Sequence, residues 1–337
     1  YTNGIVYADF AFELEGGGPP DLFLPLFTAA LTGIGAGGRP YDRIALELAL
    51  KTGGLGTELE AGTVVGGGVR RFLFLRLKSL EDNFPEALDL LRDILLRPDL
   101  EDERRLRDIF LEFRNDLKGS IIPGGHAFAS SRAERGLSPA EAVEEKWKGI
   151  SQYRFVAGLP EGRAGRLVAE NCRRIRGSAL TRRGLTANFS APAPSWPRIL
   201  RDIQAFAEAF PQDPAPGFSA GTAPEAAETI PPLEGLAVPS AVAFVATAVP
   251  AAVLGGKEHA HEAVLAHLLG TGYLWEKIRM KGGAYGAFCS AHGRDGVLTF
   301  ASYRDPNIAS TLAAFRDALE GIARDGEIGR ASCRERV

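Results

Sequence analysis

The residues best placed to do chemistry lie in one stretch near the C-terminus, Tyr273-Leu-Trp-Glu-Lys-Ile-Arg-Met-Lys-Gly-Gly-Ala-Tyr-Gly286. Arg279 stands at the expected end of a helix, and Tyr285 stands at the expected start of a strand. A guanidinium and a phenol both donate hydrogen bonds, and together they suit an oxyanion or a peptide carbonyl. The alternative is structural: the arginine pairs with a surface carboxylate, and the tyrosine packs in a core.

The elements around this stretch would bring the two donors together. Leu274, Trp275 and Ile278 fall on one helical face, and Gly282-Gly283 ends the helix. An extended run follows, and the alternating patterns of 284–291 and 297–303, joined by a Gly-rich turn, predict a hairpin. The sequence therefore predicts that both donors point into one space beside a Gly-Gly turn.

The first two thirds of the chain predict a sheet covered by helices. Residues 2–14 alternate, with Val6, Ala8, Phe10, Phe12 and Leu14 on one face, as in a strand with one buried side. Further strands are expected at 55–61, 69–78 and 184–190, and the residues between 83 and 173 are mainly helical in pattern. Strands combined with a block of helices indicate an α+β fold.

A second domain is expected after a proline-rich segment. Residues 211–232 carry six prolines and mostly small neighbours, which is typical of a linker. A strand at 240–249 and a helix at 257–269 then repeat the order in which the chain opens, a weak internal duplication. The expected organisation is a first domain over 1–210, a linker over 211–232 and a second domain over 233–326.

Composition excludes several classes of partner. The chain has 337 residues, of which 45% are hydrophobic and 24% charged, and its formal net charge is −3. This balance indicates neither a nucleic-acid surface nor a polybasic membrane patch. No apolar run reaches the ~20 residues that span a bilayer. We therefore expect no nucleic-acid partner and no membrane partner.

The two ends of the chain are expected to be artificial boundaries. The N-terminus opens directly in strand-like sequence without a methionine, as if cut from something longer. The last residues, 327–337, read Glu-Ile-Gly-Arg-Ala-Ser-Cys-Arg-Glu-Arg-Val. Their reverse translation into DNA resembles a common sequencing adapter. We expect this tail to be an artefact. On that interpretation the second domain is truncated near Gly326.

No metal, phosphate or nucleophile motif is visible. The five histidines, at 126, 259, 261, 267 and 292, form neither H-x-x-E-H nor H-E-x-x-H. The three cysteines lack CxxC spacing, so neither a disulfide framework nor a cysteine zinc site is indicated. Lys281-Gly282-Gly283 has the wrong order for a phosphate-binding loop. We expect no metal ligand and no cofactor-binding residue in this chain.

The sequence resembles the C-terminal half of a presequence-protease-type metallopeptidase of the pitrilysin and insulinase clan. The resemblance spans nearly all of 1–310 and rests above all on the stretch from Tyr273 to Gly286, with Ser302-Tyr-Arg-Asp-Pro306. It implies two homologous α/β-sandwich domains of the pitrilysin/LuxS-like metallohydrolase type, the second truncated. Such enzymes are built as two bowls that close on a chamber, and this chain resembles the second bowl.

The resemblance also implies a division of labour. The family's zinc is held in the first bowl by an inverted H-x-x-E-H motif and a distal glutamate, all absent from this sequence. The expected cofactor is therefore zinc, bound by the missing N-terminal half of the same polypeptide. By resemblance, Arg279 and Tyr285 would reach across the chamber to the scissile peptide and stabilise its carbonyl oxygen.

The expected function is the non-zinc half of a zinc-dependent endopeptidase that degrades unstructured peptides, with the fragment alone inactive. The alternative is a catalytically inactive peptide-binding or scaffold homologue of the same fold. The expected partners are the N-terminal half and a peptide substrate. The expected compartment is the cytoplasm or, since the N-terminus is missing, an organellar matrix.

Overall fold

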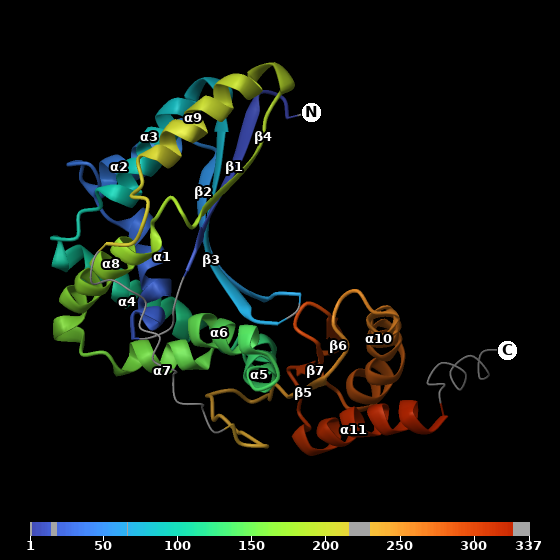
Figure 1. Ribbon diagram of the computed structural model, residues 1–337. Helices are drawn as coiled ribbons and strands as arrows, with labels where there is room; N and C mark the ends of the chain where they lie inside the picture. The colour runs from blue at the N-terminus through green and yellow to red at the C-terminus, as the bar shows by residue number, and fades with distance from the viewer. Residues whose placement is uncertain (1, 15–18, 66, 216–229, 326–337) are drawn as a thin grey trace. The chain divides into compact units, whose positions relative to one another are not determined.

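The computed structural model describes residues 2–14, 19–65, 67–215 and 230–325 (Figure 1). Its contacts divide the chain into two compact units. The first comprises Tyr1–Glu60, Arg70–Asp116 and Gln152–Ala227, and the second comprises Ala61–Val69, Leu117–Ser151 and Glu228–Val337. These units are not continuous in sequence, unlike the two expected domains. Residues 216–229 of the expected linker and the whole adapter-like tail lie outside the described residues, and both remain predictions.

The first unit is built on a four-stranded sheet in the order β2-β3-β1-β4. The strands are β1 (Ile5–Glu13), β2 (Gly54–Thr63), β3 (Val69–Leu80) and β4 (Leu185–Ser190). Strand β1 runs antiparallel to both β3 and β4. Val6, Ala8, Phe10 and Phe12 are fully buried, whereas Tyr7 between them is exposed. The alternation predicted from the sequence is therefore confirmed.

The other elements of the first unit are helical. They are α1 (Leu24–Gly33), α2 (Tyr41–Lys51), α3 (Phe84–Leu96), α4 (Glu103–Ser120), α7 (Ile150–Gly158), α8 (Ala164–Ala179) and α9 (Trp196–Glu208), with short turns η1 to η4 between them. Figure 1 shows α3 and α9 lying along the sheet. The ring centroid of Phe10 lies 4.6 Å from that of Phe206 on α9, and Phe12 lies 5.1 Å from Phe210. Aromatic packing between strand β1 and the α9 segment thus contributes to the core of this unit.

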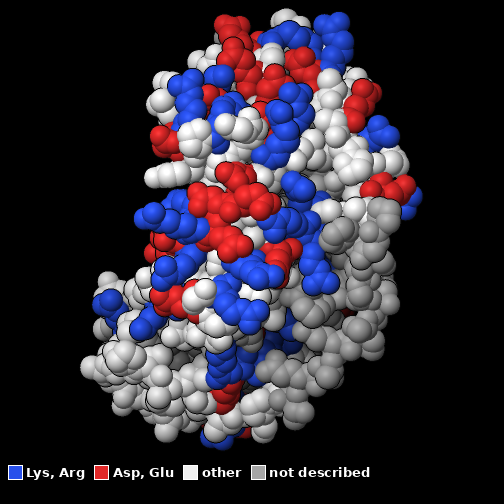
Figure 2. All heavy atoms as spheres, turned by 90° about the vertical axis from the view of Figure 1, so that its left-hand side faces the viewer, with Lys and Arg blue, Asp and Glu red and all other residues white. Residues whose placement is uncertain are grey.

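The surface of the helices is mixed in charge. Figure 2 shows Lys and Arg interspersed with Asp and Glu over the face that it draws. Helix α4 illustrates the pattern, with Leu106, Ile109 and Phe110 buried and most of its charged residues exposed. Among the described residues, no helix combines the length and apolarity that a bilayer crossing requires.

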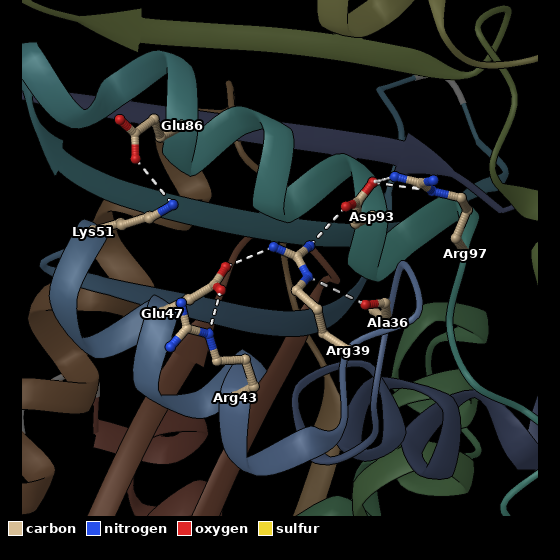
Figure 3. Close-up of polar contacts among 8 residues, drawn as sticks. All are labelled: Ala36, Arg39, Arg43, Glu47, Lys51, Glu86, Asp93 and Arg97. Atoms are coloured by element: carbon tan, nitrogen blue, oxygen red, sulfur yellow. Dashed lines mark hydrogen bonds and ion pairs between the residues drawn. The ribbon is translucent and has the colours of Figure 1, made fainter.

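A network of charges joins α2 to α3 on the outside of the first unit (Figure 3). Arg39 donates to Glu47 at 2.6 Å and to Asp93 at 2.7 Å, and Arg43 donates to Glu47 at 2.8 Å. Burial of Glu47 favours its protonated form, but the hydrogen bond from Arg43 and the charge of Arg39 lower the pKa of this carboxyl overall. Gly37 adopts φ +59, and a side chain there would lie 2.6 Å from the Asp93 carboxylate. The glycine-rich loop therefore leaves room for the network.

The second unit contains a three-stranded sheet in the order β5-β7-β6. The strands are β5 (Ala246–Pro250), β6 (Gly286–His292) and β7 (Val297–Tyr303), and the helices are α5 (Gly125–Glu134), α6 (Pro139–Lys148), α10 (Lys257–Leu268), η5 (Leu269–Tyr273), η6 (Trp275–Lys281) and α11 (Ile308–Asp325). Phe300 of β7 packs on Phe315 of α11 and is fully buried. The predicted hairpin is confirmed as β6 and β7.

The two sheets share a strand order. In the first unit the hairpin β2-β3 lies beside β1, and in the second the hairpin β6-β7 lies beside β5. Strand β1 is antiparallel to β3 just as β5 is antiparallel to β7. The weak duplication seen in sequence therefore has a counterpart in topology. Strand β5 is shorter than expected: Ala243 forms only an isolated bridge with Asp305, so residues 240–245 do not extend the strand.

Polar contacts explain why the segments 61–69 and 117–151 belong to the second unit. Thr63, at the end of β2, donates to Asp295 in the β6-β7 turn at 2.7 Å. Thr299 of β7 donates to Glu134 of α5 at 2.5 Å, and this pair is buried. Buried polar groups are costly unless they are satisfied, so these bonds fix the three segments relative to one another.

Candidate functional site

Arg279 and Tyr285 lie together at the junction between η6 and β6 in the second unit. Arg279 is exposed in the last turn of η6, and Tyr285, immediately before β6, keeps 66% of its surface exposed. The guanidinium carbon of Arg279 lies 6.0 Å from the centroid of the Tyr285 ring. The sequence prediction that the two side chains share one space is confirmed.

The Gly-Gly turn makes this approach possible. Gly283 adopts φ +80, a left-handed conformation that favours glycine, and its N–H donates to the Arg279 carbonyl at 3.1 Å. The N–H of Ala284 donates to the Ile278 carbonyl, also at 3.1 Å. A Cβ on Gly282 would lie only 2.5 Å from that same carbonyl oxygen. These contacts end the helix and reverse the chain within two residues.

The helix that carries Arg279 is wound as a π-helix. Leu274 and Ile278 are buried against the sheet, but Trp275 is 41% exposed. The expectation that Trp275 shares their face is wrong. Residues four apart along a helix lie on one face, whereas the next residue is turned by roughly 100°. π-Helical turns are rare and are found frequently at functional sites.

The structure adds Tyr303 and Arg304, at the end of β7, to the site. The Tyr285 N–H donates to the carbonyl of Tyr303 at 3.0 Å and to that of Arg304 at 3.4 Å. The rings of Tyr285 and Tyr303 lie 5.8 Å apart, edge to face. The guanidinium carbon of Arg304 lies 5.3 Å from the Tyr303 ring centroid. Two arginines therefore flank a pair of tyrosines.

Hydrogen bonds at the start of α11 hold the end of β7 and the end of η6 together. Asp305 is buried and accepts hydrogen bonds from the Asn307 N–H at 2.8 Å and from the Thr311 hydroxyl at 2.6 Å. The Asn307 side chain then donates from Nδ2 to the carbonyl of Gly282 at 2.6 Å. The loop after β7 is thus tied directly to the loop after η6.

Helix α5 supports the site from behind. His126 packs its ring edge to face on Tyr303, with centroids 5.0 Å apart, and lies 5.7 Å from the ring of Phe288. The preceding Gly125 is needed for this approach, because a Cβ there would fall 2.3 Å from the Phe244 ring. His126 is therefore a packing residue beside the tyrosine pair.

Exposure and ion pairing bear on the structural alternative for Arg279 and Tyr285. With two thirds of its surface exposed, Tyr285 is not a core residue. Within the described residues, no carboxylate forms an ion pair with Arg279, although the neighbouring Lys281 pairs with Glu276 at 2.5 Å. The two side chains are exposed donors on a rigid junction, an arrangement that suits binding a carbonyl or another anionic oxygen.

The site offers no nucleophile. The nearest thiol in sequence is Cys289 of β6, which faces the core of the second unit. Burial raises the pKa of Cys289 to about 12, so the thiol stays protonated and unreactive at neutral pH. The described part of the chain also holds no group of three His, Cys, Asp or Glu side chains that could bind a metal ion. These residues therefore do not fit a zinc centre.

Solved structures identify the fold. A conserved protein from Enterococcus faecalis V583 matches 98% of this chain and 78% of its own, with a TM-score of 0.66 at 14% identity. The peptidase M16 inactive domain from Pseudomonas fluorescens matches 96% of this chain and 75% of its own, with a TM-score of 0.61 at 15% identity. Pitrilysin matches 96% and 34%, with a TM-score of 0.53 at 16% identity. The chain has the α+β fold of the pitrilysin class, as expected.

Sequence comparisons then specify the family. Residues 1–159 match the family of domains associated with subfamily C of the M16 peptidases, and residues 233–328 match the PreP C-terminal domain. The mitochondrial presequence protease of Danio rerio is 28% identical over 95% of this chain and 33% of its own length. Presequence protease 1, chloroplastic/mitochondrial, of Arabidopsis thaliana is 26% identical over 97% of this chain and 31% of its own. The chain belongs to subfamily C of the M16 peptidases and corresponds to their C-terminal half.

The chain spans about a third of the length of the curated relatives that it matches. Arg279, Tyr285, Tyr303 and Arg304 all lie within the part that matches the PreP C-terminal domain. The resemblance inferred from the Tyr273–Gly286 stretch is confirmed at the level of the family.

Proposed function

We propose that this chain is the non-zinc half of a zinc-dependent endopeptidase that degrades unstructured peptides. In this proposal Arg279 and Tyr285 bind the carbonyl oxygen of the peptide bond that is cleaved. The observation that carries the proposal is the exposed pair itself, with the Arg279 guanidinium carbon 6.0 Å from the Tyr285 ring at a rigid junction.

The chemistry of the pair supports this role. A carbonyl oxygen gains negative charge when its carbon is attacked, and donors held in place stabilise that charge without reorganising. The guanidinium offers several N–H groups and the phenol offers one O–H. The backbone bonds from Gly283 and Ala284 fix the helix end, and the bond from the Tyr285 N–H fixes the strand start. The donors are thus preorganised by the fold.

The proposal assigns the metal to another part of the protein. The described residues of this chain do not fit a zinc site, so the N-terminal half of the same polypeptide would hold the ion. Peptide and N-terminal half are the proposed partners. The relatives are named as mitochondrial or chloroplastic/mitochondrial, and for this protein we propose the cytoplasm or an organellar matrix.

A second candidate is a catalytically inactive peptide-binding or scaffold homologue. One solved structure of the same fold is described as an inactive domain of an M16 peptidase, which favours this candidate. The two differ in what the whole protein does. The inactive homologue would bind peptides at the same pair of donors without cleaving them.

Cleavage of an internally quenched peptide tests the proposal. The full-length protein should hydrolyse the peptide, and a metal chelator should abolish the activity. This chain alone should show no chelator-sensitive hydrolysis. A full-length protein that binds its peptide but never cleaves it would establish the second candidate, and chelator-sensitive cleavage by this chain alone would overturn the division into two halves.

A further inference from the structure

Arg304 occupies an unusual backbone conformation. Its φ of 49 lies in the left-handed region, and among described residues other than glycine only Asn3 shares this property. Asparagine tolerates this region well, but arginine has no such preference. Hydrogen bonds on both sides hold Arg304 in this conformation. The carbonyl of Tyr303, before it, accepts from the Tyr285 N–H, and the buried carboxylate of Asp305, after it, accepts from the Asn307 N–H. Strained positions of this kind concentrate at functional sites.

The side chain of Arg304 extends a row of side chains that begins at Arg279. Along this row the guanidinium carbon of Arg279 lies 6.0 Å from the Tyr285 ring, the Tyr285 ring 5.8 Å from the Tyr303 ring, and the Tyr303 ring 5.3 Å from the guanidinium carbon of Arg304. Alternate residues of an extended peptide are spaced by about 6.5 to 7 Å. Each step of the row thus corresponds to nearly two residues of a peptide laid along it.

No described acidic side chain neutralises the charge of Arg304 in an ion pair. In the described ranges Arg304 forms no ion pair, whereas several exposed arginines elsewhere are paired, for example Arg70 with Glu13 at 2.8 Å. The adjacent Asp305 is not available, because it is buried and its carboxylate caps α11. A guanidinium with open donors binds carboxylates in a bidentate manner.

We propose that Arg304 binds a carboxylate of the peptide whose scissile carbonyl is held by Arg279 and Tyr285. The carboxylate belongs to an aspartate or glutamate side chain or to the peptide's C-terminus. From the length of the row, it lies within about four residues of the cleaved bond. This inference rests on the proposed function and adds a determinant of substrate choice to it.

Sets of four peptides test the proposal in the full-length protein. Each set combines Glu or Gln at one position with a free or an amidated C-terminus, and the position is moved from set to set over about four residues on either side of the cleaved bond. The wild type should favour one carboxylate over its neutral counterpart by roughly fivefold in kcat/KM, as expected for an exposed ion pair. The position of that preference identifies which carboxylate is bound.

The variant Arg304→Asn removes the guanidinium and keeps a residue suited to the left-handed backbone. It should abolish the preference, so that the acidic and the neutral peptide are cleaved with equal kcat/KM, and keep or raise the melting temperature. The matched control is Arg316→Asn, because Arg316 is exposed on α11 of the same unit. Equal cleavage of all peptides by the wild type, or a preference that survives in Arg304→Asn, would overturn the proposal.

Binding measurements separate this failure from failure of the proposed function. If the protein cleaves no peptide, fluorescence anisotropy with the same labelled peptides still reports whether Arg304→Asn weakens binding of the acidic one. Selective binding without cleavage would refute the enzyme and retain the Arg304 site. Cleavage without a preference for the acidic peptide would retain the enzyme and refute the Arg304 site.

Discussion

Asn307 donates a hydrogen bond from Nδ2 to the carbonyl oxygen of Gly282 at 2.6 Å. Gly282 follows the helix that carries Arg279, and Asn307 precedes α11 and follows Arg304. The bond therefore joins the two loops from which the two arginines and two tyrosines project. A second connection between the same segments is made by the N–H of Tyr285, which donates to the carbonyls of Tyr303 and Arg304.

We predict that Asn307→Asp impairs peptide cleavage more than it impairs folding. Aspartate is the same size but cannot donate to the Gly282 carbonyl, so the loops lose their tie. A negative side chain before α11 favours the helix N-terminus and offsets part of the lost bond, which is worth about 1 kcal/mol. Thermal unfolding should change by only a few degrees while kcat/KM falls. A large loss of stability with unaltered activity per folded molecule would contradict the predicted role.

We predict opposite effects for two Gly→Ala substitutions in the second unit. Gly283→Ala should destabilise the protein by about 1 to 2 kcal/mol, because alanine resists the left-handed conformation at φ +80. Gly321→Ala, in α11, should stabilise it by about 0.5 to 1 kcal/mol, since no atom lies within 4 Å of the added methyl group. Chemical denaturation of the two variants measures both effects. A neutral or stabilising effect of Gly283→Ala would show that the turn does not require glycine.

The pH dependence of stability should report on Glu141, at the start of α6. Burial, with the negative charges of Glu134 and Asp295, raises the pKa of Glu141 from 4.5 to about 7. The folded state therefore holds this proton more tightly than the unfolded state. The resulting stability is complete below the unfolded pKa and is lost as the pH rises through the folded pKa.

Glu141→Gln removes this titration. Its melting temperature should exceed that of the wild type at about pH 8, and the difference should shrink at about pH 5. The control Glu208→Gln lies at the exposed end of α9 and should shift both values little. A difference between Glu141→Gln and the wild type that is the same at both pH values would exclude Glu141 as the titrating group.

Periodic patterns made most of the fold predictable. Residues 2–14 alternate, and the structure places β1 (Ile5–Glu13) within them with the predicted side buried. The hairpin strands were equally clear, because the turn between β6 and β7 is rich in glycine. Strand β5 was overestimated, since the apolar residues 240–245 pack as an irregular segment. An apolar run alone does not reveal where pairing starts.

The site was predictable only where one stretch of sequence contains both partners. Arg279 and Tyr285 are six residues apart, and the intervening Gly-Gly turn indicates that they meet. Tyr303 and Arg304 come from the end of another strand, and only the pairing of β6 with β7 places them beside Tyr285. The sequence signal for their position was Asp305-Pro-Asn307, a turn and helix cap that marks the end of the strand just after Tyr303 and Arg304.

The most direct measurement is the turnover of a quenched peptide by full-length protein carrying Arg279→Ala, Tyr285→Phe or both. If the pair stabilises the carbonyl oxygen as it gains charge, each change should lower kcat by about 100-fold or more. The double variant should lose less than the product of the two losses, because the donors act together. Bound zinc and melting temperature should stay at wild-type levels, and Arg316→Ala should retain full activity. A loss near twofold for Arg279→Ala, with the protein folded and its metal bound, would contradict the account.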